Sequence, residues 1–415
     1  MQNSIPFIEK FLSHFQEAFS KKQMSVFQEV IYAMFHDYKR LSLASLADHA
    51  NINYQKLQYF FSESDWNIDQ LNTIRLKILN NQITTRPSPK SVLAIDDTSC
   101  PKPHAQKTQG AQFQYCGSLG REENCNVAVA SCFVSESKHC PLNFKSYVPD
   151  AQPQEFKSKL DLAKELIIDA IDKNIPFKAI VFDAWYTASD LIEFIASQAR
   201  SLVAEVKINR SILWTDPVTK QRIYKRADQI IPLIKQFFPH KLKPVFIPQA
   251  NGKTKSVFTY CFQSNLKDCS TQLQILFIFD KWSDSDEKNV HVLVTNNLTF
   301  SPETIIKTYL LRWGIEESFR ELKDNFAFDQ YQVRHQEQIQ RHWILAFLAW
   351  SLTYWIKNNG CLSKIIDHPP QSIGQCKDAV ASLLIIDSAF LLSKNPDAAR
   401  ILGIKSQKFI NQRKY

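Results

Sequence analysis

The 415-residue chain is 44% hydrophobic and 22% charged, the balance of a folded globular protein, and it is long enough for two or three domains. Its formal charge of +9 favours a polyanionic partner, whereas 8 glycines without a G-x-G-x-x-G or Walker loop argue against a glycine-rich nucleotide-binding fold. The sequence shows neither a signal peptide nor a long apolar run, so we expect a cytoplasmic protein without membrane spans. Its nine cysteines form no C-x-x-C pair, which argues against a zinc site and favours reduced thiols.

Residues 1–88 are predicted to form a helical domain, with a helix-turn-helix over residues 42–61 and a turn at residues 51–53. If this pair of helices binds DNA, Lys56 and Gln58 are the candidates to face the groove; helical hairpins also occur in many proteins that bind no DNA. The expected apolar faces are Leu43, Leu46, Ala47 and Ala50 on the first helix, and Tyr54, Leu57 and Phe61 on the second.

A polar, proline-containing linker at residues 82–90 separates this domain from a region of extended periodicity. The first part of the core, residues 89–208, is predicted to contain three strands, a helix, a strand, a helix and a strand. This order is typical of an RNase H-like α/β fold with a mixed sheet, although other α/β folds share parts of it. The predicted elements are strands 91–98, 126–134 and 140–148, helix 154–173, strand 177–185, helix 189–198 and strand 202–208.

Residues 209–289 are predicted to be a β-rich insertion subdomain, after which a strand resumes at residue 291. Residues 207–255 carry eleven Lys and Arg against two Asp, which indicates either a solvated basic face or a surface that contacts DNA phosphates. Lys207 and Arg210 are candidates for such contacts. Residues 290–358 are predicted to hold the last core strand and a helical region opened by Ser301 and Pro302, and residues 359–415 a helical C-terminal region of open role.

Three carboxylates are singled out by their positions: Asp96 or Asp97 and then Asp183 end predicted strands, and Glu316 lies on the helix after the insertion subdomain. Carboxylates at strand ends project at one edge of an α/β sheet, where sites are commonly found. Three oxygen ligands from distant segments suit Mg²⁺ or Mn²⁺, and two such ions about 3.5–4 Å apart can activate an attacking oxygen and stabilise a leaving one. Taken alone, each aspartate is better explained as the end of a strand or the cap of a helix.

The helical segment at residues 308–326 places several functional side chains on one face. At 100° per residue, Tyr309, Arg312, Glu316, Arg320 and Lys323 fall within about 80° of arc, apart from an apolar stripe. An amphipathic helix with a salt-bridged outer face would explain these charges, but not Tyr309. This placement requires one continuous helix. An interruption at Gly314 would weaken the expected placement of Tyr309 and Arg312 on that face.

The spacing of Tyr309, Arg312, Glu316 and Lys323 resembles the YREK signature of insertion-sequence transposases of the DDE class, and AIDDT and IVFDAW resemble that family's two aspartate strands. The resemblance covers roughly residues 90–355. It implies an RNase H-like core in which Asp97, Asp183 and Glu316 are the catalytic metal ligands for Mg²⁺, or Mn²⁺ as its substitute, with two ions bound. Asp96 would be a neighbour that tunes Asp97.

The same resemblance implies a transposase that binds terminal inverted repeats, hydrolyses phosphodiester bonds at element ends and joins the 3′-OH ends to target DNA. Its partners would be double-stranded DNA and a second copy of the chain in a synaptic complex, in the prokaryotic cytoplasm or nucleoid. Tyr309, Arg312 and Lys323 would contact phosphates, and further DNA-binding candidates are Arg320, Lys207, Arg210 and His291. Some members hold a flipped base with a tryptophan; His291 occupies that position here, Trp214 and Trp282 are other candidates, and base flipping stays open.

Two alternatives remain at this stage. One is a nuclease on the same core that cuts DNA without joining it. The other is a DNA-binding regulator whose core is inactive, against which the retention of all three carboxylates and Lys323 argues.

Overall fold

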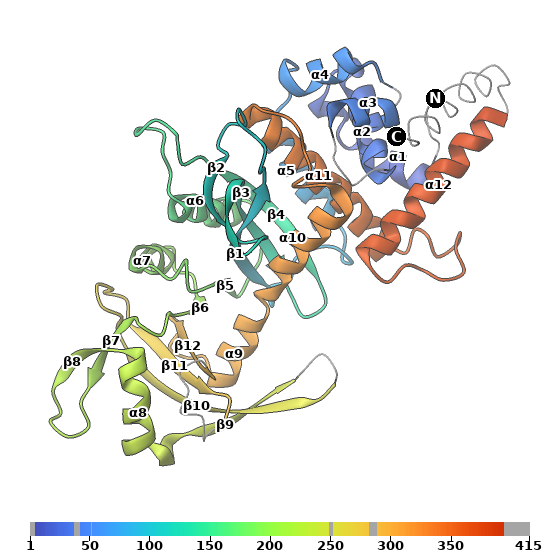
Figure 1. Ribbon diagram of the computed structural model, residues 1–415. Helices are drawn as coiled ribbons and strands as arrows, with labels where there is room; N and C mark the ends of the chain where they lie inside the picture. Colours follow the sequence, from blue (N-terminus) through green and yellow to red (C-terminus); the bar gives the residue numbers. More distant parts are fainter. Residues whose placement is uncertain (1–4, 37–41, 51, 249–251, 282–288, 394–415) are drawn as a thin grey trace. The chain divides into compact units, whose positions relative to one another are not determined.

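The computed structural model describes residues 5–36, 42–50, 52–248, 252–281 and 289–393. The chain forms two compact units (Figure 1). The helical unit comprises residues 1–86, 107–109 and 320–415, and the sheet unit comprises residues 87–106 and 110–319. The prediction of a mixed α/β protein with an N-terminal helical region and C-terminal helices is confirmed. The predicted domain boundaries remain predictions.

The helical unit packs around α11 (Gln336–Asn358), whose side chains are buried almost continuously from Ile339 to Ile356. A helix that is apolar on all sides must be covered by others. Its neighbours are α1 (Pro6–Ser13), α2 (Lys21–His36), α4 (Tyr54–Ser62), α5 (Ile68–Asn80) and α12 (Ile373–Ser393). In the described part of the chain, no helix is long and apolar enough to cross a bilayer.

The predicted helix pair is present as α3 (Leu43–Ala50) and α4. The Asn53 side chain caps α4 by accepting hydrogen bonds from the backbone N–H groups of Gln55 and Lys56. The expected apolar face of α4 is wrong at Tyr54, which is 47% exposed, because Phe60 takes the buried position beside Leu57 and Phe61.

The central sheet of the sheet unit contains ten strands, in the order β2-β3-β1-β5-β6-β12-β11-β10-β9, with β4 also paired to β3. Strands β1, β5 and β6 are parallel to one another, and the other pairings are antiparallel. The core strands are β1 (Val92–Pro101), β2 (Gln112–Cys116), β3 (Arg121–Val134), β4 (His139–Tyr147), β5 (Ala179–Phe182) and β6 (Leu202–Glu205).

The strands predicted at residues 126–134 and 140–148 are confirmed as the antiparallel pair β3 and β4, and the predicted helices as α6 (Lys159–Asp172) and α7 (Ser189–Ser197). One strand was missed: β2 lies in a stretch expected to be a polar loop. It pairs with the first residues of β3, which extends further toward the N-terminus than its apolar run. Strand pairing gives hydrogen-bond partners to the backbone N–H and C=O groups of this exposed stretch, and it does not require apolar side chains.

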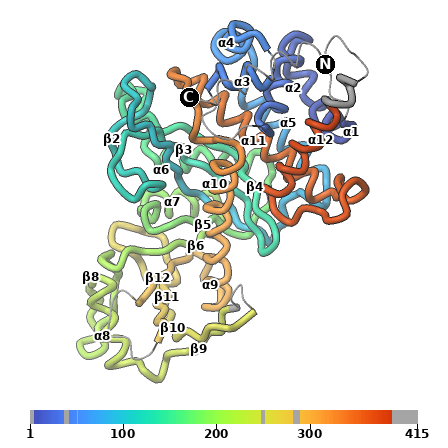
Figure 2. The backbone as a smooth tube through the Cα atoms, turned by 45° about the vertical axis from the view of Figure 1, so that its right-hand side comes forward, coloured from blue at the N-terminus to red at the C-terminus, as the bar shows by residue number. Residues whose placement is uncertain are grey.

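The segment at residues 209–289 contains two parts. Strands β7 (Ser211–Thr215) and β8 (Arg222–Arg226) form a separate two-stranded sheet, and α8 (Ala227–Phe237) is a helix that was not expected. Strands β9 (Lys243–Pro248), β10 (Thr254–Ser264) and β11 (Leu273–Phe279) continue the core sheet through β12 (Val290–Thr295), as Figure 2 shows. Because β11 is buried along its whole length, it requires neighbours on both edges, and β10 and β12 supply them.

The helical region after β12 is divided into α9 (Pro302–Leu310) and α10 (Trp313–Phe326). The Ser301 side chain caps α9 and Pro302 opens it, as predicted. A turn at residues 311–312 separates the helices, so the one continuous helix assumed for Tyr309 and Arg312 is interrupted, although Arg312 still pairs with Glu316 four residues on. Near the start of α10, a Cβ on Gly314 would lie 2.3 Å from Cγ1 of Val134 in β3, so only glycine fits this approach.

Candidate active site

The register between β1 and β5 brings two aspartates to the same level of the sheet. The parallel pairing ends at Ala94 opposite Val181, and two further residues lead to Asp96 on one strand and Asp183 on the other. Asp183 directly follows β5, as predicted. Asp96 and Asp97, in contrast, were expected at a strand end but lie within β1, which continues along β3 to Pro101 after its parallel neighbour has ended.

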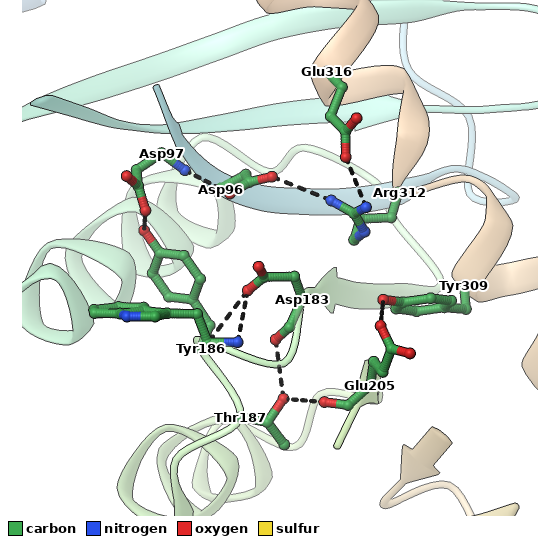
Figure 3. A network of polar contacts seen from close by, with 10 residues as sticks. Asp96, Asp97, Asp183, Tyr186, Thr187, Glu205, Tyr309, Arg312 and Glu316 are labelled. Carbon is green, nitrogen blue, oxygen red and sulfur yellow. Dashed lines mark hydrogen bonds and ion pairs between the residues drawn. The ribbon is translucent and has the colours of Figure 1, made fainter. Parts of the chain in front are cut away.

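Asp96 and Asp97 contact different groups (Figure 3). Asp96 lies 3.2 Å from Nη1 of Arg312. Asp97 accepts hydrogen bonds from Nζ of Lys159 at 2.8 Å and from the hydroxyl of Tyr186 at 3.0 Å. Successive side chains of a strand point to opposite faces, and this alternation separates the two carboxylates.

Arg312 connects the first strand to the helix that carries Glu316. Its Nη2 lies 2.7 Å from Oε1 of Glu316, while Nη1 faces Asp96. The Arg312 residue is only 9% exposed, and its guanidinium also lies 5.3 Å from the centre of the Trp313 ring. A guanidinium with donors in a fixed plane can hold two carboxylates in this way. Figure 3 thus shows Asp96, Arg312 and Glu316 in one chain of contacts above Asp183.

The carboxylates repel one another. Burial, and then the charges of Asp183 and Asp97, raise the pKa of Asp96 to about 7, against a smaller lowering by Arg312. Burial and the same three aspartates also hold the pKa of the Tyr186 hydroxyl well above its ordinary value, so this hydroxyl stays protonated and donates to Asp97. Such an excess of negative charge in a buried place favours cations.

Glu205, at the end of β6, is a site residue that the sequence reasoning missed. It accepts a hydrogen bond from the Tyr309 hydroxyl at 2.9 Å and lies 2.8 Å from Nδ1 of His291. The contact with His291 lowers the pKa of Glu205 most, and the hydroxyl of Tyr309 lowers it further against the effect of burial. The sequence held a signal for Glu205, because it lies at the end of a predicted strand, as Asp183 does. The structure places these two strands, β6 and β5, side by side.

Four predicted site residues, Asp97, Asp183, Arg312 and Glu316, lie in this region. Asp96, named as the neighbour of Asp97, lies there too. Tyr309 and His291 contact Glu205 beside them. Lys207 and Arg210 lie in the loop that follows β6. Arg320, exposed, and Lys323, half-buried, belong to the part of α10 in the helical unit.

The two tryptophans considered for base contacts are not equivalent. Trp214 is 3% exposed and packs against Phe238 and Phe262, so it is a core residue. Trp282 lies outside the described residues.

The carboxylates fit a divalent cation in kind, because Mg²⁺ and Mn²⁺ prefer oxygen ligands. In the ranges that the structure describes, no three His, Cys, Asp or Glu side chains are close enough together to hold a metal ion. The Glu316 carboxylate is paired with Arg312, whose positive charge lies between it and Asp96. Metal ligation by Glu316 therefore requires this ion pair to open.

Residues 14–243, more than half of the chain, match the family described as DDE superfamily endonuclease. The match includes Asp96, Asp97 and Asp183 and ends before Glu316. The chain is 21% identical over 352 residues to a probable transposase for insertion sequence element IS701 of Microchaete diplosiphon, covering 81% of this chain and 84% of that protein. The solved Drosophila P element transposase strand transfer complex aligns with 93% of this chain and 87% of its own, at 11% identity and a TM-score of 0.22, which is too low to support an argument.

Proposed function

Because the chain belongs to the family of DDE superfamily endonucleases, we propose that it is a DNA transposase acting on the ends of an insertion sequence. The observation that carries the proposal is that Arg312 links Asp96 to Glu316, while the charge of Asp183 also acts on Asp96. Similarity to a probable transposase over most of both chains supports the finer assignment. The strand order β4-β3-β1-β5-β6, with only β1, β5 and β6 parallel, supports an RNase H-like core.

Asp183, Glu316 and one aspartate of β1 would hold two Mg²⁺ or Mn²⁺ ions. The sequence resemblance implies Asp97 as the third ligand. The contacts favour Asp96, because it faces Asp183 and the partner of Glu316, whereas Asp97 is held by Lys159 and Tyr186. When bound, the metal ions would polarise the phosphate and activate the attacking oxygen.

Two phosphoryl transfers would take place at this site. In the first, water attacks the phosphorus at the element end, and the bond to the 3′ oxygen breaks to leave a 3′-OH. In the second, this 3′-OH attacks a phosphodiester of target DNA, and the target's own 3′ oxygen leaves. No covalent bond to the protein forms in either step.

The chain's own cations would bind the DNA and stabilise charge. If Glu316 held a metal ion, Arg312 would lose this partner and could donate hydrogen bonds to a phosphate, with the Tyr309 hydroxyl beside it. Lys323, Arg320, Lys207, Arg210 and His291 are further candidates to bind DNA.

The partners in this proposal are double-stranded terminal inverted repeats, target DNA and a second copy of the chain. The helix pair α3–α4 is the candidate end-binding element, since Lys56 and Gln58 are both exposed on α4. Contacts to phosphates would make the binding weaken steeply with salt.

The test is cleavage of DNA that carries the element's own ends, with and without Mg²⁺ or Mn²⁺. Asp183→Asn and Glu316→Gln should abolish cleavage while end binding persists. Glu317→Gln is a matched control, because this neighbouring glutamate of α10 is exposed and faces His139 instead of the carboxylates. Normal cutting by Asp183→Asn would refute the proposed site.

Two further outcomes separate the alternatives. If the protein cleaves element ends but never joins pre-cleaved ends to target DNA, it is a nuclease and not a transposase. End binding without cleavage by the wild-type protein under any metal would leave a DNA-binding regulator.

A further inference from the structure

Glu205 holds a fixed place beside the candidate site. It ends β6, which lies between β5 and β12 in the central sheet. Its backbone carbonyl oxygen lies 2.5 Å from the hydroxyl oxygen of Thr187, and that hydroxyl lies 3.0 Å from the backbone carbonyl oxygen of Asp183 (Figure 3). The end of β6 is therefore tied to the loop that carries Asp183.

Both oxygens of the Glu205 carboxylate have partners. Oε2 accepts a hydrogen bond from the Tyr309 hydroxyl at 2.9 Å, and Oε1 lies 2.8 Å from Nδ1 of His291 on β12. The contact with His291, then the hydroxyl of Tyr309 and the charge of Arg312, lower the pKa of Glu205 against the effect of burial, so the carboxylate is ionised. Its side chain is 28% exposed, which partly shields these contacts from water and strengthens them.

Tyr309 in turn contacts Arg312. Cζ of Arg312 lies over the Tyr309 ring, 5.9 Å from its centre, and the same guanidinium pairs with Asp96 and Glu316. Burial and then the charge of Glu205 raise the pKa of the Tyr309 hydroxyl, so this hydroxyl stays protonated and remains a donor. Glu205 thus fixes the hydroxyl end of a ring that lies against Arg312.

We propose that Glu205 is a positioning residue for phosphoryl transfer, which holds Tyr309, and Arg312 beside it, where both can meet a phosphate. This inference rests on the proposed function, in which Tyr309 and Arg312 contact DNA phosphates. The hydroxyl has a single proton, which it donates to Glu205 in the free protein and to a phosphate oxygen once DNA is bound. Rotation about the C–O bond makes this exchange and leaves the ring in place, while His291 keeps Glu205 partnered.

The same arrangement makes Glu205 unfavourable for DNA binding itself. Its negative charge repels phosphates, and it competes with them for the proton of the Tyr309 hydroxyl. Loss of the carboxylate should therefore slow the reaction without weakening the binding of DNA. A residue that served only the fold would behave differently, because its loss would reduce binding and reaction together.

The experiment uses the full-length protein and a labelled duplex that carries the element's own end. It measures the affinity for this duplex in chelator and the first-order rate of cleavage with Mg²⁺ at saturating protein. Glu205→Ala should slow cleavage roughly 10- to 100-fold by misplacing Tyr309, and should bind the duplex at least as tightly as wild type. Glu303→Ala is a matched control, because this carboxylate of α9 pairs with Lys307 on the surface and its loss should change neither quantity.

Glu205→Gln separates the hydrogen bond from the charge, and it replaces Glu205→Ala if that variant does not fold. The amide oxygen can accept from Tyr309, and the amide N–H can donate to the neutral ring of His291. Glu205→Gln should therefore retain most of the wild-type rate. A loss as large as that of Tyr309→Phe would overturn the proposal, because the charge and not the hydrogen bond would then be needed.

Tyr309→Phe completes a double-mutant cycle. Removing the hydroxyl should slow cleavage roughly 10- to 100-fold, the effect of one hydrogen bond to a charged group. In this background Glu205→Ala should change the rate by less than about twofold, because no hydroxyl remains to be positioned. Additive losses, or weaker binding by Glu205→Ala at an unchanged rate, would overturn the inference alone. If the wild-type protein cleaves the duplex with no metal, the transposase proposal fails and this inference fails with it.

Discussion

The carboxylates of Asp96 and Asp97, neighbours in β1, point to opposite sides of the strand. Asp96 faces Arg312, which in turn pairs with Glu316, and Asp97 faces Lys159 and Tyr186. Two adjacent residues of the same type therefore have different surroundings, and their roles can be separated by mutation.

The first prediction compares Asp96→Asn with Asp97→Asn in metal-dependent cleavage of element ends. We expect Asp96→Asn to slow cleavage about 10³-fold or more, since loss of a metal ligand removes several kcal/mol of charge stabilisation. Asp97→Asn should slow cleavage roughly tenfold, the effect expected of a residue that holds a metal ligand in place without binding the metal itself. The reverse order would assign Asp97 as the ligand, as the sequence resemblance implies.

The second prediction concerns pH. The pKa of Asp96 is raised to about 7, above that of an unfolded aspartate, so the folded protein binds this proton more tightly than the unfolded chain. Its contribution to the free energy of unfolding is therefore complete at low pH and is lost as pH rises toward 7 and beyond. Without metal, Asp96→Asn should melt increasingly above wild type between pH 5 and pH 8. Mg²⁺ or Mn²⁺ should narrow the gap at pH 8, because it binds the ionised carboxylate. Parallel melting curves across this range would contradict the assignment.

The third prediction tests the close approach of α10 to β3. A Cβ at Gly314 would lie 2.3 Å from Cγ1 and 2.9 Å from Cγ2 of Val134. We expect Gly314→Ala to destabilise the protein by about 1–3 kcal/mol through overpacking, and to lower cleavage by displacing Glu316. In the double variant with Val134→Ala, part of the lost stability and part of the lost cleavage activity should be recovered. Fully additive effects in thermal unfolding would show that this contact does not position the helix.

The fourth prediction concerns Arg341, a buried cation of the helical unit. Its guanidinium donates to the backbone carbonyls of Phe61 in α4 and of Ser64 just after it, pairs with Glu337 and lies 4.6 Å from the centre of the Trp66 ring. Removing it leaves buried carbonyls without donors, so Arg341→Ala should cost about 3 kcal/mol. Arg341→Lys should recover little, because an ammonium cannot reproduce the planar set of donors. Calorimetry would check this, and a change below about 1 kcal/mol for Arg341→Ala would contradict it.

Local patterns in the sequence were sufficient for much of the fold and of the site. Apolar runs of strand length, followed by a carboxylate, located Asp183. The Ser301 and Pro302 start signal located α9, and the spacing of Tyr309, Arg312 and Glu316 drew attention to a segment that contacts Asp96 and Glu205. Each of these signals depends on residues a few positions apart, where backbone geometry is set by neighbours.

Tertiary structure alone decided which aspartate of β1 contacts Arg312. Residues 92–95 are buried on both faces of the sheet, so their apolar run carries no alternation from which a direction could be read. The direction follows instead from the register with β5, a pairing between residues more than 80 positions apart.

The same reason explains the other differences. The continuation of the core sheet through β9, β10 and β11 and the place of Glu205 both depend on which distant segments pair. Arg312, in the turn between α9 and α10, pairs with Glu316 four residues on, and its contact with Asp96 joins segments 216 positions apart. The sequence by itself determined the carboxylates and cations available to this protein, and non-local strand pairing decided which of them meet.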